Sequence, residues 1–305
     1  MYDNPYLDLE ASATVAGAAD AVTAGFEVQL NSVVLTKNDG LLSEATAADW
    51  ADKKVYVPST DTEIFGGPLI PGSDAQGSSL SLEVLDQYVA EVVTDEVELD
   101  GDDKVVSFTA PDLSDVDVVM VGRRSPSNGS YHAVPGFDTE TGGYYPLSLQ
   151  WGPYTADGDQ VRTVSISGDM VDQKRENRSY AGKSARIENA ADLEAFTRAL
   201  AAIDASGKDI PVVTVINAKN PVVPTEIEPE STAVMVGFGV SDEALIQVAT
   251  GQHEPQSSLP MGFPASMDAV EAQQEDVPGD METYVDAAGH DWAFGYGLNW
   301  SGPIG

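Results

Sequence analysis

The segment 123–185 collects most of the side chains that could recognise or transform a ligand. It holds five of the seven arginines and seven aromatic residues, in a stretch rich in glycine and without regular periodicity. These residues are Arg123, Arg124, Arg162, Arg175, Arg178, Tyr131, Phe137, Tyr144, Tyr145, Trp151, Tyr154 and Tyr180. Long irregular segments are uncommon in compact domains and often carry function. We therefore expect the chemistry of this chain to lie in that segment.

Several other kinds of chemistry are excluded by residue types that the chain lacks. It has no cysteine, which rules out thiol catalysis, disulfides, iron–sulfur clusters and thiolate zinc sites. The only histidines are His132, His253 and His290, and no two of them have a metal-binding spacing or suggest a Ser/His/Asp triad. We expect neither a metal nor a cofactor.

Charge excludes two classes of partner. The 305 residues include 15 Lys and Arg against 50 Asp and Glu, a net charge of −35. Nucleic-acid binding needs clustered cations, and anionic membrane surfaces repel such a chain, so neither partner is expected. Hydrophobic residues make up 42%, enough for a sizeable core. The acidity fits either a salt-rich source or a plain acidic surface.

No apolar run approaches the length of a membrane span, and the first twelve residues, MYDNPYLDLEAS, lack the features of a signal peptide. A cytoplasmic location is therefore expected.

The pattern of apolar residues predicts alternating helices and strands. Helices are expected at 10–35, at 191–204 with Asn189 as N-cap, and at 241–251 with Ser241 as N-cap. Strands are expected at 54–58, 115–122, 211–216 and 231–239. The segment 59–79 resembles a loop, and 80–93 fits a helix or a strand equally well. This order indicates an α/β fold with a mostly parallel sheet.

The acidic run DEVELDGDD at 95–103 could be a calcium loop or a solvated turn. Its spacing departs from the calcium-binding pattern, so a solvated turn is favoured.

Several segments together resemble glycoside hydrolase family 3. The stretch 257–304 carries a Leu-Pro step, the sequence AVEAQQEDVP and the ending FGYGL, all similar to the C-terminal region of that family. Upstream, SVVLTKNDGLL at 32–42 and AVMVGFGVSDEALIQVATG at 233–251 look like two further family segments. YYPLSLQWGPYTA at 144–156 and NRSY at 177–180 are similar to a bacterial branch.

The resemblance implies one of the two core domains of such an enzyme. Family members combine a (β/α)8-type barrel, which carries the nucleophilic Asp, with an α/β sandwich. A barrel needs roughly 250 residues, and the resemblance to the sandwich begins near residue 1. We therefore expect one domain over 1–305: a three-layer sandwich with a mostly parallel six-stranded sheet flanked by helices. It would carry an irregular insertion at 123–185 and a tail at 252–305.

A retaining glycosidase needs two carboxyl groups roughly 5–5.5 Å apart. The resemblance places the acid/base just after the strand at 117–122, but GRRSPSNGSY at 122–131 contains no carboxylate. Glu176 and Glu140, later in the same loop, are the candidate catalytic acids. The neighbouring Arg175 and Arg178 would lower the pKa of Glu176, which is unfavourable for a general acid.

Sugar rings stack on aromatic faces, so some residues of this segment could line a sugar subsite or pack the loop onto the sheet. Arg123 and Arg124 could contact hydroxyls or a partner's carboxylates, or form local salt bridges. The candidate substrate-binding residues are Trp151, Tyr154, Tyr131, His132, Arg123 and Arg124.

Two functions follow. In the first, the chain is the sandwich half of a β-glucosidase-like enzyme acting on β-glycosides, inactive alone, with its barrel on another chain or a longer precursor. The aromatic segment would then form an apolar patch facing that barrel. In the second, it is an inactive remnant or a carbohydrate-binding module.

Overall fold

The computed structural model describes residues 8–66, 72–129, 136, 138, 140, 143–164, 170–171, 174–175, 179–274 and 276–304. In these ranges no helix is long and apolar enough to cross a membrane.

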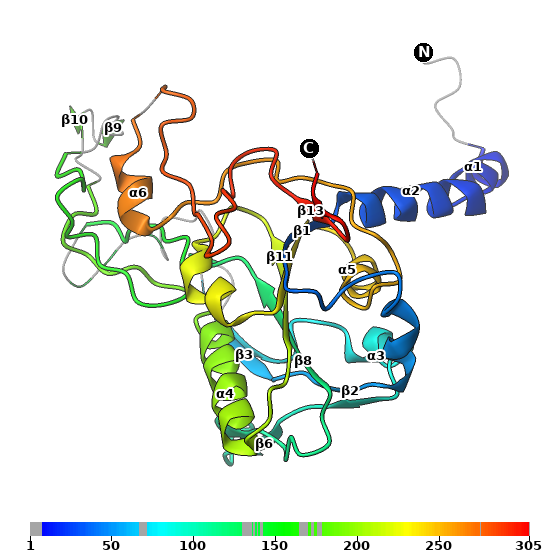
Figure 1. Ribbon diagram of the computed structural model, residues 1–305. Coiled ribbons are helices and arrows are strands. Elements are labelled where there is room, and N and C mark those ends of the chain that lie inside the picture. Colours follow the sequence, from blue (N-terminus) through cyan, green and yellow to red (C-terminus); the bar gives the residue numbers. More distant parts are fainter. Residues whose placement is uncertain are drawn as a thin grey trace.

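A sheet of eight strands forms the centre of the protein (Figure 1). In spatial order the strands are β14 (Gly302–Pro303), β13 (Leu298–Asn299), β1 (Val34–Asn38), β12 (Ala233–Phe238), β11 (Val212–Ala218), β8 (Val118–Arg124), β2 (Lys54–Tyr56) and β5 (Glu91–Val93). The five strands from β12 to β5 are parallel, whereas β1 and the hairpin β13–β14 run antiparallel to their neighbours. The α/β class is confirmed. The sheet is two strands wider than expected, because the tail adds a hairpin of two-residue strands beside β1.

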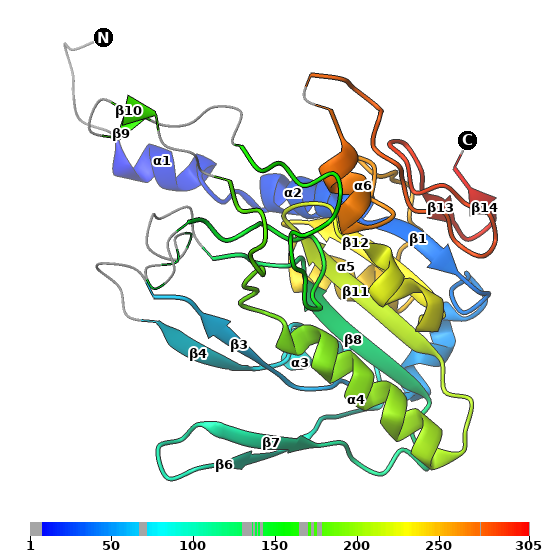
Figure 2. The same cartoon turned by 90° about the vertical axis from the view of Figure 1, so that its left-hand side faces the viewer.

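Both faces of the sheet are covered by apolar packing. Helices α2 (Ala19–Ser32), α3 (Leu82–Leu85) and α5 (Asp242–Ala249) contribute Leu30, Leu85 and Leu245 to the core on one face. On the other face lies α4 (Ala191–Ser206), in front of β8 and β11 in Figure 2, together with parts of the tail. Parallel strands buried on both sides need nearly continuous apolar sequence, and PVVTVI and AVMVGF provide it.

The helix ends test the capping predictions. The Ser241 hydroxyl accepts from the Ala244 amide, as expected of an N-cap. Asn189 is not the cap of α4, which begins after Ala190; its amide group donates instead to the Asp192 carboxylate. The single helix expected at 10–35 is two, α1 (Leu9–Val15) and α2, separated around Gly17, where φ is +76°.

Two hairpins were missed by the sequence patterns. Part of the expected loop 59–79 forms β3 (Thr60–Ile64) and β4 (Ser73–Gly77), and the first half of the acidic run forms β6 (Glu96–Leu99), paired with β7 (Val105–Thr109). The polar residues of β3 and β4 leave no apolar pattern, whereas the alternation Glu96-Val97-Glu98-Leu99 marks β6 and was overlooked within the acidic run. The ambiguous segment 80–93 contains both α3 and β5. The remaining elements are η1 (Ala47–Asp52), β9 (Met170–Val171), β10 (Lys174–Arg175), η2 (Pro224–Glu226), η3 (Glu228–Glu230) and α6 (Met267–Ala272).

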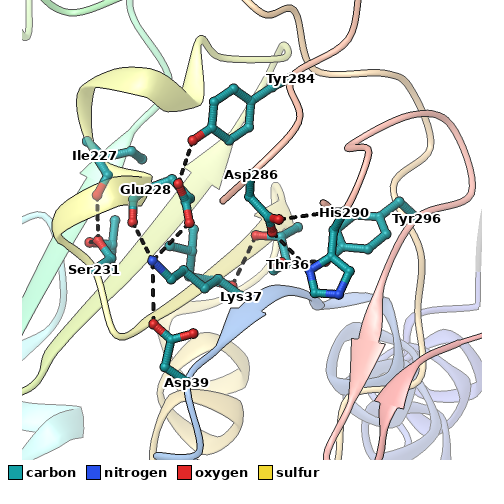
Figure 3. A network of polar contacts seen from close by, with 12 residues as sticks. Thr36, Lys37, Asp39, Ile227, Glu228, Ser231, Tyr284, Asp286, His290 and Tyr296 are labelled. Atoms are coloured by element: carbon teal, nitrogen blue, oxygen red, sulfur yellow. Dashed lines mark hydrogen bonds and ion pairs between the residues drawn. The ribbon is translucent and has the colours of Figure 1, made fainter. Parts of the chain in front are cut away.

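A buried ion pair joins β1 to the segment before β12 (Figure 3). The Lys37 ammonium lies 2.9 Å from one oxygen of Glu228, whose side chain is 4% exposed. The Tyr284 hydroxyl donates to the other oxygen at 2.5 Å. One carboxylate therefore holds β1 and the tail together.

A second set of contacts fixes the rest of the tail. Asp286 accepts from the backbone and ring nitrogens of His290, at 2.8 and 2.9 Å. The His290 ring stacks on Tyr296, whose hydroxyl donates to the Thr36 carbonyl (Figure 3). Although the tail is irregular, it reaches β1 directly at Tyr296 and at Leu298, which pairs with Leu35.

Replacing Lys37 tests this attachment. Lys37→Met leaves the buried Glu228 carboxylate without its cation, so the free energy of unfolding should fall by about 3–5 kcal/mol in chemical denaturation. Lys104→Met is the matched control at an exposed lysine and should change it by less than about 0.5 kcal/mol. Equal effects of the two substitutions would show that the ion pair does not hold the tail.

Candidate functional site

The candidate site is built on the edge of the sheet where the parallel strands end. Ligands of open α/β sheets bind at this carboxyl edge. The chain leaves β8 here, and the Ser125 amide donates to the Asn217 carbonyl at the end of β11. The Ser125 hydroxyl accepts from the Lys219 amide at 3.0 Å. The irregular segment therefore begins from a fixed point.

Arg123, near the end of β8, is buried inside this edge. It is 1% exposed, and its guanidinium carbon lies 4.9 Å from the Trp151 ring centroid and 4.6 Å from that of Phe196. Within the described residues its guanidinium makes no hydrogen bond. Burial lowers its pKa to about 10, an effect opposed by the charges of Asp192 and Glu226.

Asp192, in the first turn of α4, gathers three parts of the chain. It accepts from the Thr60 hydroxyl at 3.0 Å, from the Asn189 amide group at 2.8 Å and from the Arg124 backbone N–H at 3.3 Å. Burial raises its pKa, although Asn189 and Arg123 oppose this. The two ends of the irregular segment are thereby tied to one carboxylate.

Glu226 holds the middle of the segment. Its two oxygens accept from the backbone N–H groups of Trp151 at 2.7 Å and Gly152 at 2.8 Å. The Trp151 indole N–H in turn donates to the Arg124 carbonyl at 2.9 Å. Burial raises the pKa of Glu226, and the two backbone hydrogen bonds and Arg123 oppose that rise.

A third carboxylate lies further out. Glu271 on α6 accepts from the Tyr154 hydroxyl on one oxygen and from the Tyr180 hydroxyl on the other, both at 2.8 Å. Burial and the bond to Glu271 raise the pKa of Tyr180 to about 12 and raise that of Tyr154 as well. Both tyrosines therefore stay protonated donors at neutral pH.

Comparison with known proteins shows what this chain is similar to. Part of the chain is 40% identical to β-glucosidase C of Emericella nidulans over 81 residues, which are 27% of this chain and 13% of the relative. Another match is a periplasmic β-glucosidase/β-xylosidase of Dickeya chrysanthemi, 30% identical over 122 residues, 40% of this chain and 17% of the relative. No family model matches the chain.

The fold agrees with these matches. The structure of a β-glucosidase from Erythrobacter marinus superimposes with a TM-score of 0.50 at 16% identity, over 98% of this chain and 38% of that one. In sequence and in fold, the chain is thus similar to parts of β-glucosidases. It matches less than a fifth of the length of these two curated relatives and just over a third of that solved structure. The resemblance to glycoside hydrolase family 3 is confirmed.

Two of the expected sugar-binding residues are internal. Trp151 and Arg123 are each 1% exposed and pack against one another, so neither faces a ligand. The expectation for these two was wrong because the sequence shows residue types and not burial. Arg124 is exposed at the end of β8, and Tyr154 is half-buried with its hydroxyl held by Glu271.

The expected apolar patch is also less open than predicted. Of the aromatic residues of the segment that the structure describes, Trp151 is buried and the others are half-buried. These half-buried residues are Tyr144, Tyr145, Tyr154 and Tyr180. The sequence alternative, in which aromatic residues pack the loop onto the sheet, fits Trp151. Tyr131 and His132 lie outside the described residues.

The described part of the structure assigns no partner carboxylate to either candidate catalytic acid, so both stay predictions. Glu140 is exposed, and Glu176 lies outside the described residues. Asp192 and Glu226 have raised pKa values, the direction that suits a general acid. Their oxygens are occupied by internal hydrogen bonds, however, so both carboxylates serve the scaffold. Within the described ranges no group of three or more His, Asp or Glu side chains could hold a metal ion.

Sequence analysis missed Asp192, Glu226 and Glu271. Their donors lie far away along the chain: Tyr154 and Tyr180 are 117 and 91 residues from Glu271. Asp192 looked like an ordinary acid in a first helical turn, and Glu271 lies in the AVEAQ stretch that carried the family resemblance. Residue types alone give no signal for such pairings.

The raised pKa of Asp192 predicts a pH-dependent contribution to stability. The folded chain takes up a proton at Asp192 at higher pH than the unfolded chain, whose value is near 3.8. At pH values above the pKa of Asp192 in the folded chain, its ionised carboxylate therefore destabilises the fold. This destabilisation is lost as the pH falls through that pKa. Asp192→Asn should lower the unfolding free energy by about 1–3 kcal/mol near neutral pH. This deficit should grow as the pH falls from neutral toward the pKa of the unfolded chain, because only the wild type gains stability on protonation.

Chemical denaturation of both proteins at several pH values measures this difference. Glu194→Gln, at an exposed acid on the same helix, is the control and should stay within about 0.5 kcal/mol of the wild type throughout. A deficit of Asp192→Asn that shrinks on acidification would contradict the assigned direction.

Proposed function

We propose that this chain is the α/β sandwich portion of a β-glucosidase-like glycoside hydrolase. It acts on β-glycosides together with a catalytic barrel carried by another chain or a longer precursor. The barrel supplies the nucleophilic carboxylate, and this chain supplies part of the wall around the sugar.

The observation that carries the proposal is the relationship to β-glucosidases of much greater length. The matched segments are 30–40% identical to two of these enzymes and cover only 13–17% of them. The described residues form one sheet covered by helices and three small hairpins, and contain no closed barrel. A retaining glycosidase therefore needs a second domain or chain to supply the nucleophilic carboxylate.

The sheet edge provides the surface for that role. Arg124 is exposed at the end of β8, where its guanidinium can donate to sugar hydroxyls or to carboxylates of the barrel. Tyr154 presents a ring whose orientation Glu271 fixes. Glu140 and Glu176 remain the proposed proton donors, in the segment that would meet the barrel.

A second candidate function is an inactive remnant or a carbohydrate-binding module. The segment GRRSPSNG at 122–129 favours it, because it has no carboxylate where the resemblance places the acid/base. The burial of Arg123 also favours it, since that residue supports the fold and does not face a ligand.

Hydrolysis of an aryl β-glucoside, by the purified chain with and without a family 3 barrel protein from the same source, decides between these functions. The proposed function predicts hydrolysis only on mixing. In the mixture, Glu176→Gln or Glu140→Gln should then reduce the rate by about 100-fold or more, whichever residue donates the proton.

Glu243→Gln, at an exposed acid on α5, is the control and should leave the rate unchanged. Hydrolysis by the chain alone would contradict the need for a separate barrel domain or chain. No hydrolysis in the mixture would favour the remnant or binding module.

A further inference from the structure

Arg186, which follows the irregular segment 123–185, holds its guanidinium against two aromatic rings. The guanidinium carbon lies 4.1 Å from the ring centroid of Phe65, just after β3, and 5.2 Å from that of Tyr145. All three side chains are half-buried. Contacts with ring faces fix the position of a guanidinium without using its N–H donors.

The backbone around Arg186 is attached on both sides. The amide of Ala185 donates to the Tyr154 carbonyl at 2.8 Å. The amide of Glu188 donates to the Ser127 carbonyl, also at 2.8 Å, in the stretch that leaves β8. Arg186 therefore lies at the carboxyl edge of the sheet, beside the backbone of Tyr154.

The nearest acid along the sequence, Glu188, does not neutralise this cation. One oxygen of its carboxylate accepts from the Phe65 amide at 2.8 Å, and the other accepts from the Ser127 hydroxyl at 2.6 Å. Among the residues that the structure describes, the Arg186 side chain makes neither a hydrogen bond nor an ion pair. Its N–H donors are thus left for a group from outside this part of the chain.

An arginine without a carboxylate is unexpected in a protein of this composition. Acidic residues outnumber Lys and Arg by 50 to 15. Lys37, Lys183 and Arg198 each form an ion pair with one of these acids. The stretch GPLIP at 67–71, which follows Phe65 and Gly66, contains no Asp or Glu. With acids in such excess, an arginine that none of the described ones meets indicates a position kept for an outside anion.

We propose that Arg186 binds the carboxylate group of a small-molecule ligand. A guanidinium presents paired N–H donors that match the two oxygens of a carboxylate. A singly charged group suits one unpaired cation, whereas the net charge of −35 opposes a phosphate dianion more strongly.

The identity of the ligand rests on the proposed function. A β-glycoside carries a carboxylate when one of its units is a uronic acid. Arg186 adjoins the backbone of Tyr154, to which the proposed function gives a place beside the sugar. Arg186 then adds affinity for acidic glycosides and is not needed for hydrolysis of a neutral one.

Titration of the isotope-labelled 305-residue chain with glucuronate, followed by amide NMR at constant ionic strength, tests the site without any catalysis. The expected result is saturable shifts that centre on Phe65, Tyr145 and Arg186. Glucose, which has the same ring without the carboxylate, should cause no such shifts. The proposal would be overturned by equal shifts with glucose, by no saturable shifts with glucuronate, or by tighter binding of inorganic phosphate than of glucuronate.

Two substitutions separate the paired donors of Arg186 from its charge. Arg186→Met removes both, so the affinity for glucuronate should fall by about tenfold or more. Arg186→Lys keeps the charge and loses the paired donors, so the affinity should fall by a smaller factor. If Arg186→Met does not fold, Arg186→Lys still decides, because an unchanged affinity would contradict the role of the paired donors.

Lys104→Met, at an exposed lysine in the turn between β6 and β7, is the matched control and should leave the affinity unchanged. A loss equal to that of Arg186→Met would show that glucuronate responds only to the overall charge, which would contradict a site at Arg186.

The outcome is distinguishable from that of the proposed function. Glucuronate binding at Arg186 without hydrolysis of the aryl β-glucoside on mixing would keep the carboxylate site and remove the enzyme. Hydrolysis on mixing without glucuronate binding would keep the enzyme and remove this site.

Discussion

The carboxyl edge of the sheet depends on one buried cation. Arg123 enters the interior from the second-last position of β8, and its guanidinium lies between the rings of Trp151 and Phe196. Removing such a group from water is costly, and nearby carboxylates offset part of the cost. Asp192 and Glu226 lie close enough to influence its pKa, and each is itself the acceptor for backbone groups of the irregular segment. Loss of the cation would leave the buried Asp192 and the half-buried Glu226 without the positive charge beside them.

This constraint explains how the described parts of the segment 123–185 are held on the sheet. Asp192 binds Arg124 at the beginning of the segment and Asn189 just beyond its end, while Glu226 binds Trp151 and Gly152 in its middle. In a chain of net charge −35, a buried arginine is an effective centre for such an arrangement. Of the two arginines at the end of β8, Arg123 is buried and supports the fold, whereas Arg124 is exposed to solvent. In the proposed function, contacts to the sugar would fall to residues further out, including Tyr154.

The sequence predicts the regular part of the protein well and the site poorly, for a physical reason. PVVTVI and AVMVGF are apolar without interruption, so their burial in a parallel sheet follows from local composition. The cap at Ser241 is local as well. The strands β3 and β4 are polar and leave no periodic signal, whereas β6 does alternate between Glu and apolar residues, a signal that was overlooked within the acidic run. At the site, Trp151 and Arg123 are residue types that often bind ligands. Only the fold shows that these two pack against one another. Glu271 binds two tyrosines from distant parts of the chain, which no pattern of spacing reveals.

The central claim is that Arg123 and its carboxylates act as one unit that positions the irregular segment. A double-mutant cycle with Arg123→Met and Glu226→Gln measures this coupling directly in the free energy of unfolding. The account predicts that the two effects depart from additivity by about 1 kcal/mol or more, because each substitution removes the charge that compensates the other. Additivity within about 0.5 kcal/mol would contradict it and show that aromatic packing alone holds the segment on the sheet.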